Sequence, residues 1–231
     1  MRTRSHLSRT AFILPLLLAL GCALPGPVVE MGENADVTFD GLHRVRGARA
    51  GQRVWVKPDM DLSSYSELIL IGAGFHYKRP PKQARGEYAL NERQMDFVRE
   101  ELGSAIREEL IARGDWTLVD RPGPEALVLR GAIIDFVLTA APEQPTRGAT
   151  YSASVGAATL VIEVFDSQSR EILARIVNRR GLEHDDVTGW RNDPISNAAA
   201  ARRTFSHWAR KLANALEKAR SMPIPLEPVD D

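Results

Sequence analysis

The sequence predicts an α/β fold in which two long helices pack on a mixed β-sheet, and three observations support this. Two long stretches repeat apolar side chains at helical spacing. Short runs rich in Val, Ile and Leu lie before the first stretch and between the two. Roughly 170 residues remain once both ends of the chain are set aside, which is the size of one domain.

The first helix is predicted from about residue 92 to residue 113. Asn91 is placed as its N-cap, and Gln94 completes a capping box. Gly114 follows as a stop signal, and Arg113 complements the negative end of the helix dipole. The predicted apolar face consists of Met95, Val98, Leu102, Ala105, Ile106 and Leu110.

The second helix is predicted from about residue 194 to residue 220. Asp193 is placed as its cap, and Pro194 suits the first turn. A sustained apolar stripe predicts docking on the sheet, and it is formed by Ala201, Phe205, Trp208, Leu212, Ala215 and Ala219. The basic residues lie off this stripe: Arg202, Arg203, Arg210, Lys211 and Lys218.

The other elements are predicted to be strands, over residues 53–57, 68–75, 116–119, 127–139, 159–165 and 172–178. In residues 127–138 both alternating faces are largely apolar, which predicts a central strand covered on both sides. In the last strand Arg175 and Arg179 alternate with apolar residues, so this strand is predicted to lie nearer solvent. The polar residues 166–170 predict a hairpin turn between the last two strands.

The start of the chain has the pattern of an export signal. Arg2, Arg4 and Arg9 precede the apolar residues 11–21, a run too short to cross a bilayer, which needs about 20 apolar residues. Cys22, the only cysteine, ends the run. This start resembles a bacterial lipoprotein signal, which implies cleavage before Cys22 and attachment of diacylglycerol to its sulfur. An ordinary secretory signal is the alternative reading.

The resemblance to lipoproteins also implies a location. The residue after the cysteine is Ala23 and not Asp, which in sorted lipoproteins implies the outer membrane, with the protein facing the periplasm. Residues 1–21 are thus predicted to be the signal peptide, and residues 22–52, with several Gly and Pro, an acylated cysteine and flexible linker. Residues 53–220 form the predicted single domain. Residues 221–231 are a Pro-rich acidic tail that cannot be helical.

Charge and cysteine content exclude some classes of protein. The chain has 30 basic and 30 acidic residues; loss of residues 1–21 removes three arginines and no acids, leaving 27 against 30, or −3. This balance argues against general nucleic-acid binding, which needs a basic excess. With Cys22 acylated, no cysteine remains for a disulfide, so the fold must depend on its core.

Three stretches together resemble a family of proteobacterial lipoproteins known only as a domain of unknown function. They are Val54–Pro58 continuing to Leu62–Tyr65, Asp120–Arg130 leading to Asp135, and Gly156–Asp166. The resemblance spans roughly residues 53–218 and implies no activity. The resemblance implies that many relatives carry Thr-Gly at the hairpin, where this chain has Ser169-Arg170.

The predicted order of helices and strands is also similar to that of a broader group of envelope lipoproteins. These include penicillin-binding-protein activators, exopolysaccharide-secretion lipoproteins and the curli-secretion channel subunit. This second resemblance is one of architecture, which does not fix function. It implies protein contacts or ring assembly in preference to catalysis.

Two motifs have the residue types of a ligand site. Gly72-Ala-Gly74 follows a strand, but Tyr77 occupies the third glycine position of a dinucleotide-binding loop and no helix is predicted next. A strand end with close backbone packing is therefore favoured. Glu183-His-Asp-Asp186 concentrates metal-ligand side chains, but neighbours on an extended segment point to opposite faces and His207 is distant. A solvated polar loop is therefore favoured over a metal site.

Two loops are candidates for binding. Residues 76–85 are basic and would suit lipid phosphates or cell-wall carboxylates, although a solvated loop is the commoner case. Residues 140–154 are nearly uncharged and long for a strand connection, which fits either function or simple flexibility. The aspartates at strand and turn boundaries are expected to serve the backbone: Asp115, Asp120, Asp135 and Asp166.

The leading hypothesis is a non-enzymatic, outer-membrane-anchored lipoprotein that binds or supports another component of the cell envelope. Its partners would be the membrane, through the lipid on Cys22, and an envelope protein or further copies of itself. No catalytic residue, cofactor, metal or nucleic-acid partner is predicted. One alternative is a ring-type homo-oligomeric assembly subunit, and another is a metal-dependent hydrolase with its metal at Glu183–Asp186.

Overall fold

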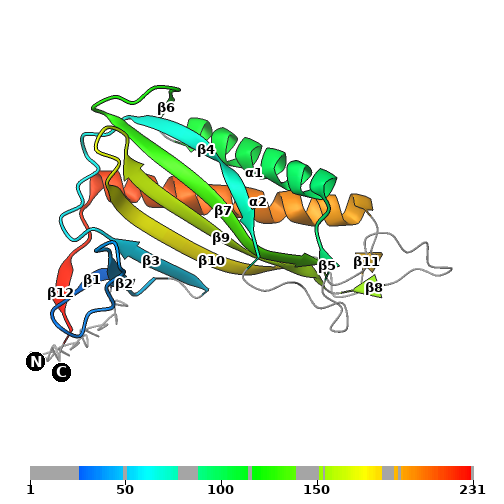
Figure 1. The fold of residues 1–231 in the computed structure, drawn as a ribbon, viewed down its shortest axis with the longest axis horizontal. Coiled ribbons are helices and arrows are strands. Elements are labelled where there is room, and N and C mark those ends of the chain that lie inside the picture. The colour runs from blue at the N-terminus through cyan, green and yellow to red at the C-terminus, as the bar shows by residue number, and fades with distance from the viewer. Residues whose placement is uncertain are drawn as a thin grey trace, which may run out of the picture.

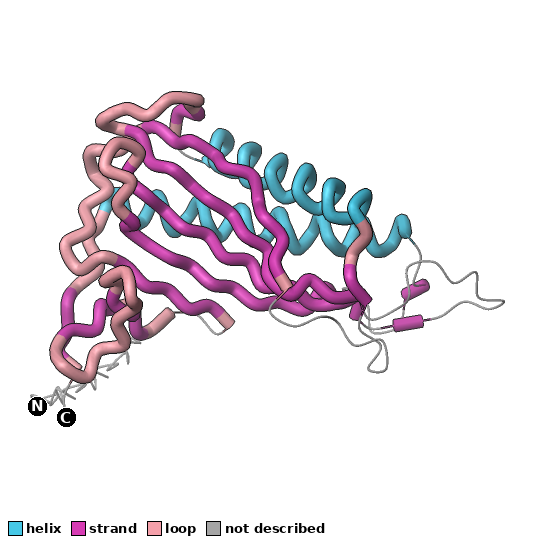
Figure 2. The backbone as a smooth tube through the Cα atoms, in the orientation of Figure 1, coloured by secondary structure: helices cyan, strands magenta, loops and turns pink. Residues whose placement is uncertain are grey.

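The computed structural model describes residues 26–48, 51–77, 88–113, 116–138, 151–152, 154–183, 190–191 and 194–229. Over these ranges the chain forms a broad sheet and two long helices, α1 (Glu92–Arg113) and α2 (Pro194–Ser221). Both helices lie on the same face of the sheet and run side by side (Figures 1 and 2). In the described part of the chain, no helix covers the opposite face.

The sheet is mixed, and its strands follow the order β12-β1-β2-β3-β10-β9-β7-β4-β6, with β5 paired to the end of β7. Strands β3, β10, β9 and β7 are antiparallel neighbours, whereas β4 runs parallel to β7 and β6. Strands β8 (Tyr151–Ser152) and β11 (Trp190–Arg191) form a separate ribbon. The strands of the sheet are β1 (Val28–Met31), β2 (His43–Arg46), β3 (Gln52–Val56), β4 (Glu67–His76), β5 (Tyr88–Ala89), β6 (Thr117–Leu118), β7 (Ala126–Leu138), β9 (Ser154–Asp166), β10 (Ile172–Glu183) and β12 (Leu226–Pro228).

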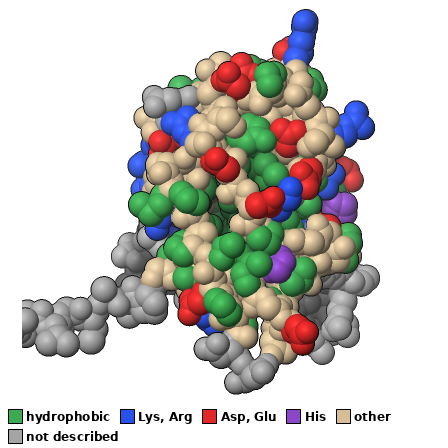
Figure 3. Space-filling model, turned by 90° about the vertical axis from the view of Figure 1, so that its left-hand side faces the viewer, with side chains coloured by type: hydrophobic (Ala, Val, Ile, Leu, Met, Phe, Trp, Pro, Cys, Tyr) green, Lys and Arg blue, Asp and Glu red, His purple; other side chains and the backbone are tan. Residues whose placement is uncertain are grey.

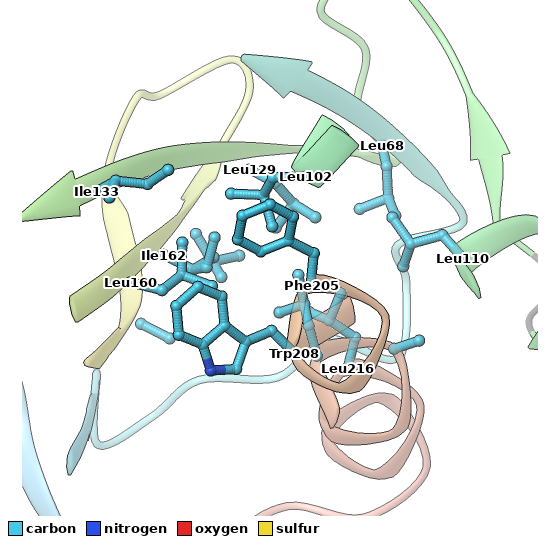
Figure 4. Close-up of a cluster of buried hydrophobic side chains, with 14 of the residues drawn as sticks. Leu68, Leu102, Leu110, Leu129, Ile133, Leu160, Ile162, Phe205, Trp208 and Leu216 are labelled. Atoms are coloured by element: carbon cyan, nitrogen blue, oxygen red, sulfur yellow. The ribbon is translucent and has the colours of Figure 1, made fainter. Parts of the chain in front are cut away.

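The hydrophobic core lies between the sheet and the two helices. Phe205 and Trp208 extend from α2 toward the strands, with their ring centroids 5.9 Å apart (Figure 4). The indole N–H of Trp208 donates a hydrogen bond to Asn178 Oδ1 at 3.2 Å, so the polar atom of this buried ring is satisfied. Truncation of a buried aromatic costs about 3–5 kcal/mol. These rings pack among buried aliphatic residues that include Leu102, Leu129, Leu160, Ile162 and Leu216.

The predicted α/β class, both helices and all six predicted strands are confirmed. Helix α1 has the predicted bounds, and its capping box is formed: Asn91 N donates to Gln94 Oε1 at 2.9 Å, and Gln94 N donates to Asn91 Oδ1 at 3.0 Å. Helix α2 extends one residue beyond its predicted end. The expected cap Asp193 and the expected stop Gly114 lie outside the described residues.

The range predicted as a flexible linker contains ordered structure, so that part of the prediction is wrong. Residues 28–31 and 43–46 form β1 and β2, and each strand buries a valine, Val29 or Val45. The glycines of this range do not mark flexibility, because Gly32, Gly41 and Gly47 adopt positive φ angles at tight turns. The strands beside these turns have four residues each, which is too few to show an apolar period in the sequence.

The predicted tail also contributes to the sheet. Strand β12 lies within residues 221–231 and pairs in parallel with β1, with Val29 opposite Leu226. Prolines on both sides of this pairing suit an edge strand, where one row of backbone groups faces outward. Within the described residues, neither helix has the length and apolar character that crossing a membrane requires.

Strand β7 is central, as predicted, and lies between β9 and β4. The prediction that both of its faces are covered is wrong for the described part of the chain. Val128 and Ile134 project from the face without helices and stay half-buried. Their cross-strand neighbours, Phe165 and Thr159, shield them partly, so an apolar pattern on both faces arises without a second layer.

A bulge in β7 lets this strand place side chains in the core both before and after the bulge. Asp135 adopts a φ of +52°, and the pairing with β9 shifts between Ile134 and Val137. The extra residue places Phe136 in the core. The Tyr77 hydroxyl donates a hydrogen bond to the Phe136 carbonyl oxygen at 2.7 Å, which holds the irregular backbone in place.

The turn between β9 and β10 contains a second residue in the left-handed region. Asp166 N donates to the Glu171 carbonyl at 3.0 Å, and Arg170 N donates to the Asp166 carbonyl at 3.0 Å. Arg170 has a φ of +62°, a conformation that costs a residue with a side chain about 1–2 kcal/mol. A glycine at this position would remove that cost.

We expect Arg170→Gly to stabilise the protein by about 0.5–1 kcal/mol, because relief of the left-handed strain exceeds the added entropy of the unfolded chain. For a domain of this size the melting temperature rises by about 1–4 °C. Arg121→Gly is the control, since Arg121 is exposed in a turn without a positive φ. That variant should melt at the wild-type temperature or below. A lower melting temperature for Arg170→Gly would contradict the prediction.

Candidate functional site

The face of the sheet without helices carries a row of side chains that crosses six strands. Each residue lies directly opposite the next in the strand register, so all six project from one face. From β4 to β2 the row is Ile71, Arg130, Glu163, Arg175, Trp55 and Arg44. We call these six residues the cross-strand row.

Glu163 is the centre of the row and binds an arginine on each side. Arg130 donates from Nε and Nη2 to Glu163 Oε2, at 3.0 and 2.6 Å, and Arg175 Nε donates to Oε1 at 2.9 Å. The second anion comes from outside the row, because the Arg175 guanidinium also makes two hydrogen bonds to the Asp40 carboxylate. Two cations and two anions therefore balance, and each carboxylate receives charge-assisted hydrogen bonds.

The hydrogen bonds of this network shift the pKa values of two of its members, against the effect of their partial burial. Burial alone raises the pKa of Asp40, but its hydrogen bonds with Arg175 and Thr38 outweigh burial and hold that pKa below its usual value. Burial alone lowers the pKa of Arg175, and its hydrogen bonds with Asp40 and Glu163 raise it above the usual value. Both residues are therefore ionised at neutral pH.

Aromatic rings accompany the arginines on this face. The guanidinium carbon of Arg44 lies 4.8 Å from the centre of the Trp55 ring, and that of Arg130 lies 4.7 Å from the Phe165 ring. The ring of Phe39 lies 5.8 Å from the Arg175 guanidinium and is 97% exposed. Aromatic residues and arginine are the types most enriched in protein–protein interfaces.

The loop between β1 and β2 displays Phe39 in a defined position. Thr38 N donates to the Leu42 carbonyl at 2.8 Å, and Leu42 N donates to Thr38 Oγ1 at 3.0 Å, which closes the loop. Leu42 is buried and anchors one end of the loop. Asp40 fastens its tip to β10 through Arg175. An exposed phenylalanine is thus held beside the cross-strand row by a buried leucine and an ion pair.

The stretches that carry the family resemblance meet at one end of the sheet. The Tyr65 hydroxyl donates to Asp166 Oδ2 at 2.9 Å, Ser66 Oγ donates to Glu125 Oε2 at 2.7 Å, and Ser167 Oγ donates to the Gly123 carbonyl at 2.9 Å. The pKa of Tyr65 is raised to about 12, mainly by burial and next by the hydrogen bond to Asp166. These residues hold the ends of β4, β7 and β9 together, and their contacts are structural.

Asp166 serves the backbone, as predicted. Its Oδ1 accepts hydrogen bonds from the N–H groups of Gln168 and Ser169, at 3.1 and 2.6 Å. Burial raises the pKa of Asp166, but these hydrogen bonds and the one from Tyr65 hold it below the usual value. Asp166 therefore stays ionised as an acceptor in a turn.

Gly72 and Gly74 lie within strand β4, where its pairing with β7 shifts between Ile71 and Gly74. They do not form a phosphate-binding turn. The expected close backbone packing is wrong, because a Cβ added at Gly72 would meet no atom of the described residues within 4 Å, and the atoms nearest to one added at Gly74 belong to the side chain of His76. A hollow of 340 Å³ lies next to them, between β4 and α1, and its lining is mainly aliphatic.

Several predicted site residues cannot be placed. Cys22, residues 184–186 of the acidic motif, residues 78–85 of the basic loop and residues 140–150 of the uncharged loop all lie outside the described residues. Within the described ranges, no group of three or more side chains is suited to hold a metal ion.

Sequence reasoning missed Asp40, Glu163 and Trp55. Asp40 falls in the range predicted as a linker. Glu163 faces Arg175 only because a bulge between Ile172 and Ala174 shifts the hairpin by one residue. The available signal was the polar alternation of β9 and β10, in which Glu163 and Arg175 interrupt otherwise apolar runs.

We expect Asp40→Asn to lower the stability by about 1–3 kcal/mol near neutral pH, because it removes charge-assisted hydrogen bonds to a partly buried arginine. Since the folded-state pKa of Asp40 is depressed, its contribution is present above the unfolded value of about 3.9 and is lost as pH falls through the folded value. The melting-temperature difference from wild type should therefore shrink below about pH 4. Glu163 is present in both proteins, so its contribution cancels from the melting-temperature difference.

Asp59→Asn is the control, because Asp59 lies 3.7 Å from Lys57 in an exposed pair of little expected value. Thermal melts of the three proteins across this pH range provide the measurement. A melting-temperature difference for Asp40→Asn that stays constant from neutral to acidic pH would contradict the prediction.

Three solved structures show distant similarity to this chain. The PelC dodecamer from Paraburkholderia phytofirmans is 12% identical, with 66% of this chain and 96% of that chain covered and a TM-score of 0.31. XCC0632 from Xanthomonas campestris, of the DUF330 family, is 13% identical over 71% and 90%, with a TM-score of 0.41. A candidate lipoprotein from Caulobacter crescentus CB15 is 14% identical over 70% and 95%, with a TM-score of 0.35. Similarities this weak support no inference about function.

None of the curated proteins matches this sequence. The family comparison is decisive, because residues 34–212, well over half of the chain, match the family described as "Protein of unknown function (DUF3313)". The matched range includes Asp40 and the whole cross-strand row. This chain is therefore a member of the DUF3313 family.

Proposed function

We propose that the protein is a non-enzymatic lipoprotein of the outer membrane, anchored through Cys22 and facing the periplasm, which binds another envelope protein through the open face of its sheet. The observation that carries the proposal is this open face, with its cross-strand row and the exposed ring of Phe39. The amino-terminal pattern that ends at Cys22 supports the anchor.

The composition of the face supports binding of a protein. The exposed large apolar residues of the face lie at its two ends. Ile71, 49% exposed, lies at the β4 end, and Val37 and Phe39 lie in the β1–β2 loop at the other end. Arginines and half-buried rings fill the space between them. Interface hot spots are enriched in aromatic and arginine residues, and these are the residue types that this face carries.

The size of the face also suits a protein partner. The six strands of the row are separated by five spacings of about 4.8 Å, and ten residues along the longer strands at about 3.3 Å rise complete a surface of about 24 Å by 33 Å. This approaches the area of about 800 Å² that each partner contributes to a standard interface. Each charged group of the row already lies near an opposite charge, either within the row or on Asp36 and Asp40 beside it, so a partner would gain apolar and stacking contacts without desolvating an isolated charge.

The anchor is tested by Cys22→Ala. We expect wild-type protein from membranes to carry two or more acyl chains at its mature amino terminus, since a single chain does not anchor a protein stably. The variant should lack them and should either retain residues 1–21 or become soluble in the periplasm. Intact-mass spectrometry and membrane fractionation provide the readouts. Identical mature masses for the two proteins, without acyl chains, would sink this part of the proposal.

The binding face is tested by a photoreactive amino acid placed at Phe39 in intact cells. We expect one discrete crosslinked product from this position and none from Ile111, which is 59% exposed on α1, away from the open face. A second substitution, Ile71→Asp, should reduce the Phe39 product several-fold, because it places an unpaired charge at the other end of the interface. Mass spectrometry of the product identifies the partner.

The outcomes of the crosslinking test are distinct. A product with a different envelope protein supports the proposal. A product between two copies of this chain would replace it with self-assembly through the same face. Equal products from positions 39 and 111, or a Phe39 product unaffected by Ile71→Asp, would show that the face is not a specific binding surface.

A further inference from the structure

A groove of 510 Å³ lies between the carboxy-terminal half of α2 and strands β2 and β3, on the helix side of the sheet. It is remote from the cross-strand row, which projects from the opposite face. Figure 3 looks onto this end of the molecule and shows hydrophobic side chains gathered over its lower half. The groove is lined mainly by apolar residues, among them Val45, Val54, Ala215, Ala219, Met222 and Ile224.

The described residues of the chain leave the groove open. After α2 ends at Ser221, residues 222–225 cross the end of the domain to reach β12, where Val29 N donates to the Pro225 carbonyl at 2.8 Å. This crossing forms a wall of the groove and does not fill it. A large apolar side chain remains at its mouth, since Met222 lines the groove and is 60% exposed. Exposed apolar surface beside an apolar groove marks a binding site for an apolar ligand.

Among the described residues, the charges that line the groove have one sign. Lys211 and Lys218 belong to its lining, two turns apart on α2, and none of the described lining residues is acidic. An apolar groove bordered by two cations is complementary to a lipid with acyl chains and an anionic phosphate.

The position of the groove along the chain supports a lipid of the membrane as the ligand. Gly26 and Pro27 line the groove, and Cys22 lies four residues before Gly26. Four residues reach at most about 14 Å. A lipid anchor on Cys22 would therefore hold the groove at the membrane surface. This step alone rests on the proposed anchoring.

We propose that this groove binds an acyl chain of an anionic membrane phospholipid, with Lys211 and Lys218 facing its phosphate. The protein then contacts the bilayer at two points, the lipid on Cys22 and the groove. The second contact fixes the orientation of the domain, because one flexible attachment leaves a domain free to rotate.

The test uses the chain from residue 22 onward with Cys22→Ala, which lacks the anchor and keeps every residue of the described fold. Vesicles of phosphatidylcholine alone are compared with an equal mixture of phosphatidylcholine and phosphatidylglycerol, each with a trace of phospholipid bearing a photoreactive acyl chain. We expect binding to the mixed vesicles and acyl crosslinks at residues 211–225. Lys211→Gln with Lys218→Gln should weaken binding to the mixed vesicles by about 30-fold, or about fivefold for each lysine.

Met222→Glu should reduce binding to both kinds of vesicle at least tenfold, because it places a charge at the apolar mouth. Ile111→Glu is the matched control, since Ile111 is 59% exposed on the outer side of α1, and it should bind as before. Both positions are exposed, so neither change threatens folding, which circular dichroism verifies.

Each result decides the inference. Absence of vesicle binding, equal effects of Met222→Glu and Ile111→Glu, or crosslinks outside the groove would overturn it. A crosslinked dimer through the groove would also overturn it in favour of a second copy as the occupant. Because the tested chain has no acylated cysteine, these results are independent of the Cys22→Ala experiment on anchoring.

Discussion

The structure depends on the packing of both helices against the same face of one sheet. Phe205 and Trp208 of α2 and the leucines of α1 fill that side, which becomes the core. The polar side chains on the other face must then find their partners on neighbouring strands of the same sheet. They do so in cross-strand pairs: Glu163 between two arginines, and rings beneath guanidinium groups. The core sets the stability, and its one-sidedness creates the surface available for function.

The long elements could be predicted from sequence because each carries many periods of its pattern. Helix α1 has six apolar residues on one face and a reciprocal capping box, so its ends and its buried side follow from local rules. Strands β1, β2 and β12 have three or four residues each, too few for a period, and their glycines and prolines imitate a linker. Their order comes from pairing between distant segments, which no local signal encodes.

The candidate site could not be predicted for a related reason. Tyr65 and Asp166 belong to recognisable stretches, and the structure shows that they fasten loops. Glu163 and Arg175 become partners only through a bulge that shifts one strand by a residue, and Asp40 joins them from a loop far away in sequence. A shift of one residue moves a side chain to the other face of a sheet, so the composition of a face depends on register.

The pairing of β1 with β12 has a consequence for the order of folding. Val29 and Leu226 come from opposite ends of the chain, so this contact closes a loop that contains nearly the whole domain. A chain that leaves the ribosome amino terminus first exposes β1 early, but β1 must wait for its partner until the last segment has emerged. Contacts of such long range form late. The end of the domain that β1 and β12 form is therefore completed last, after the central sheet has already packed against α1 and α2.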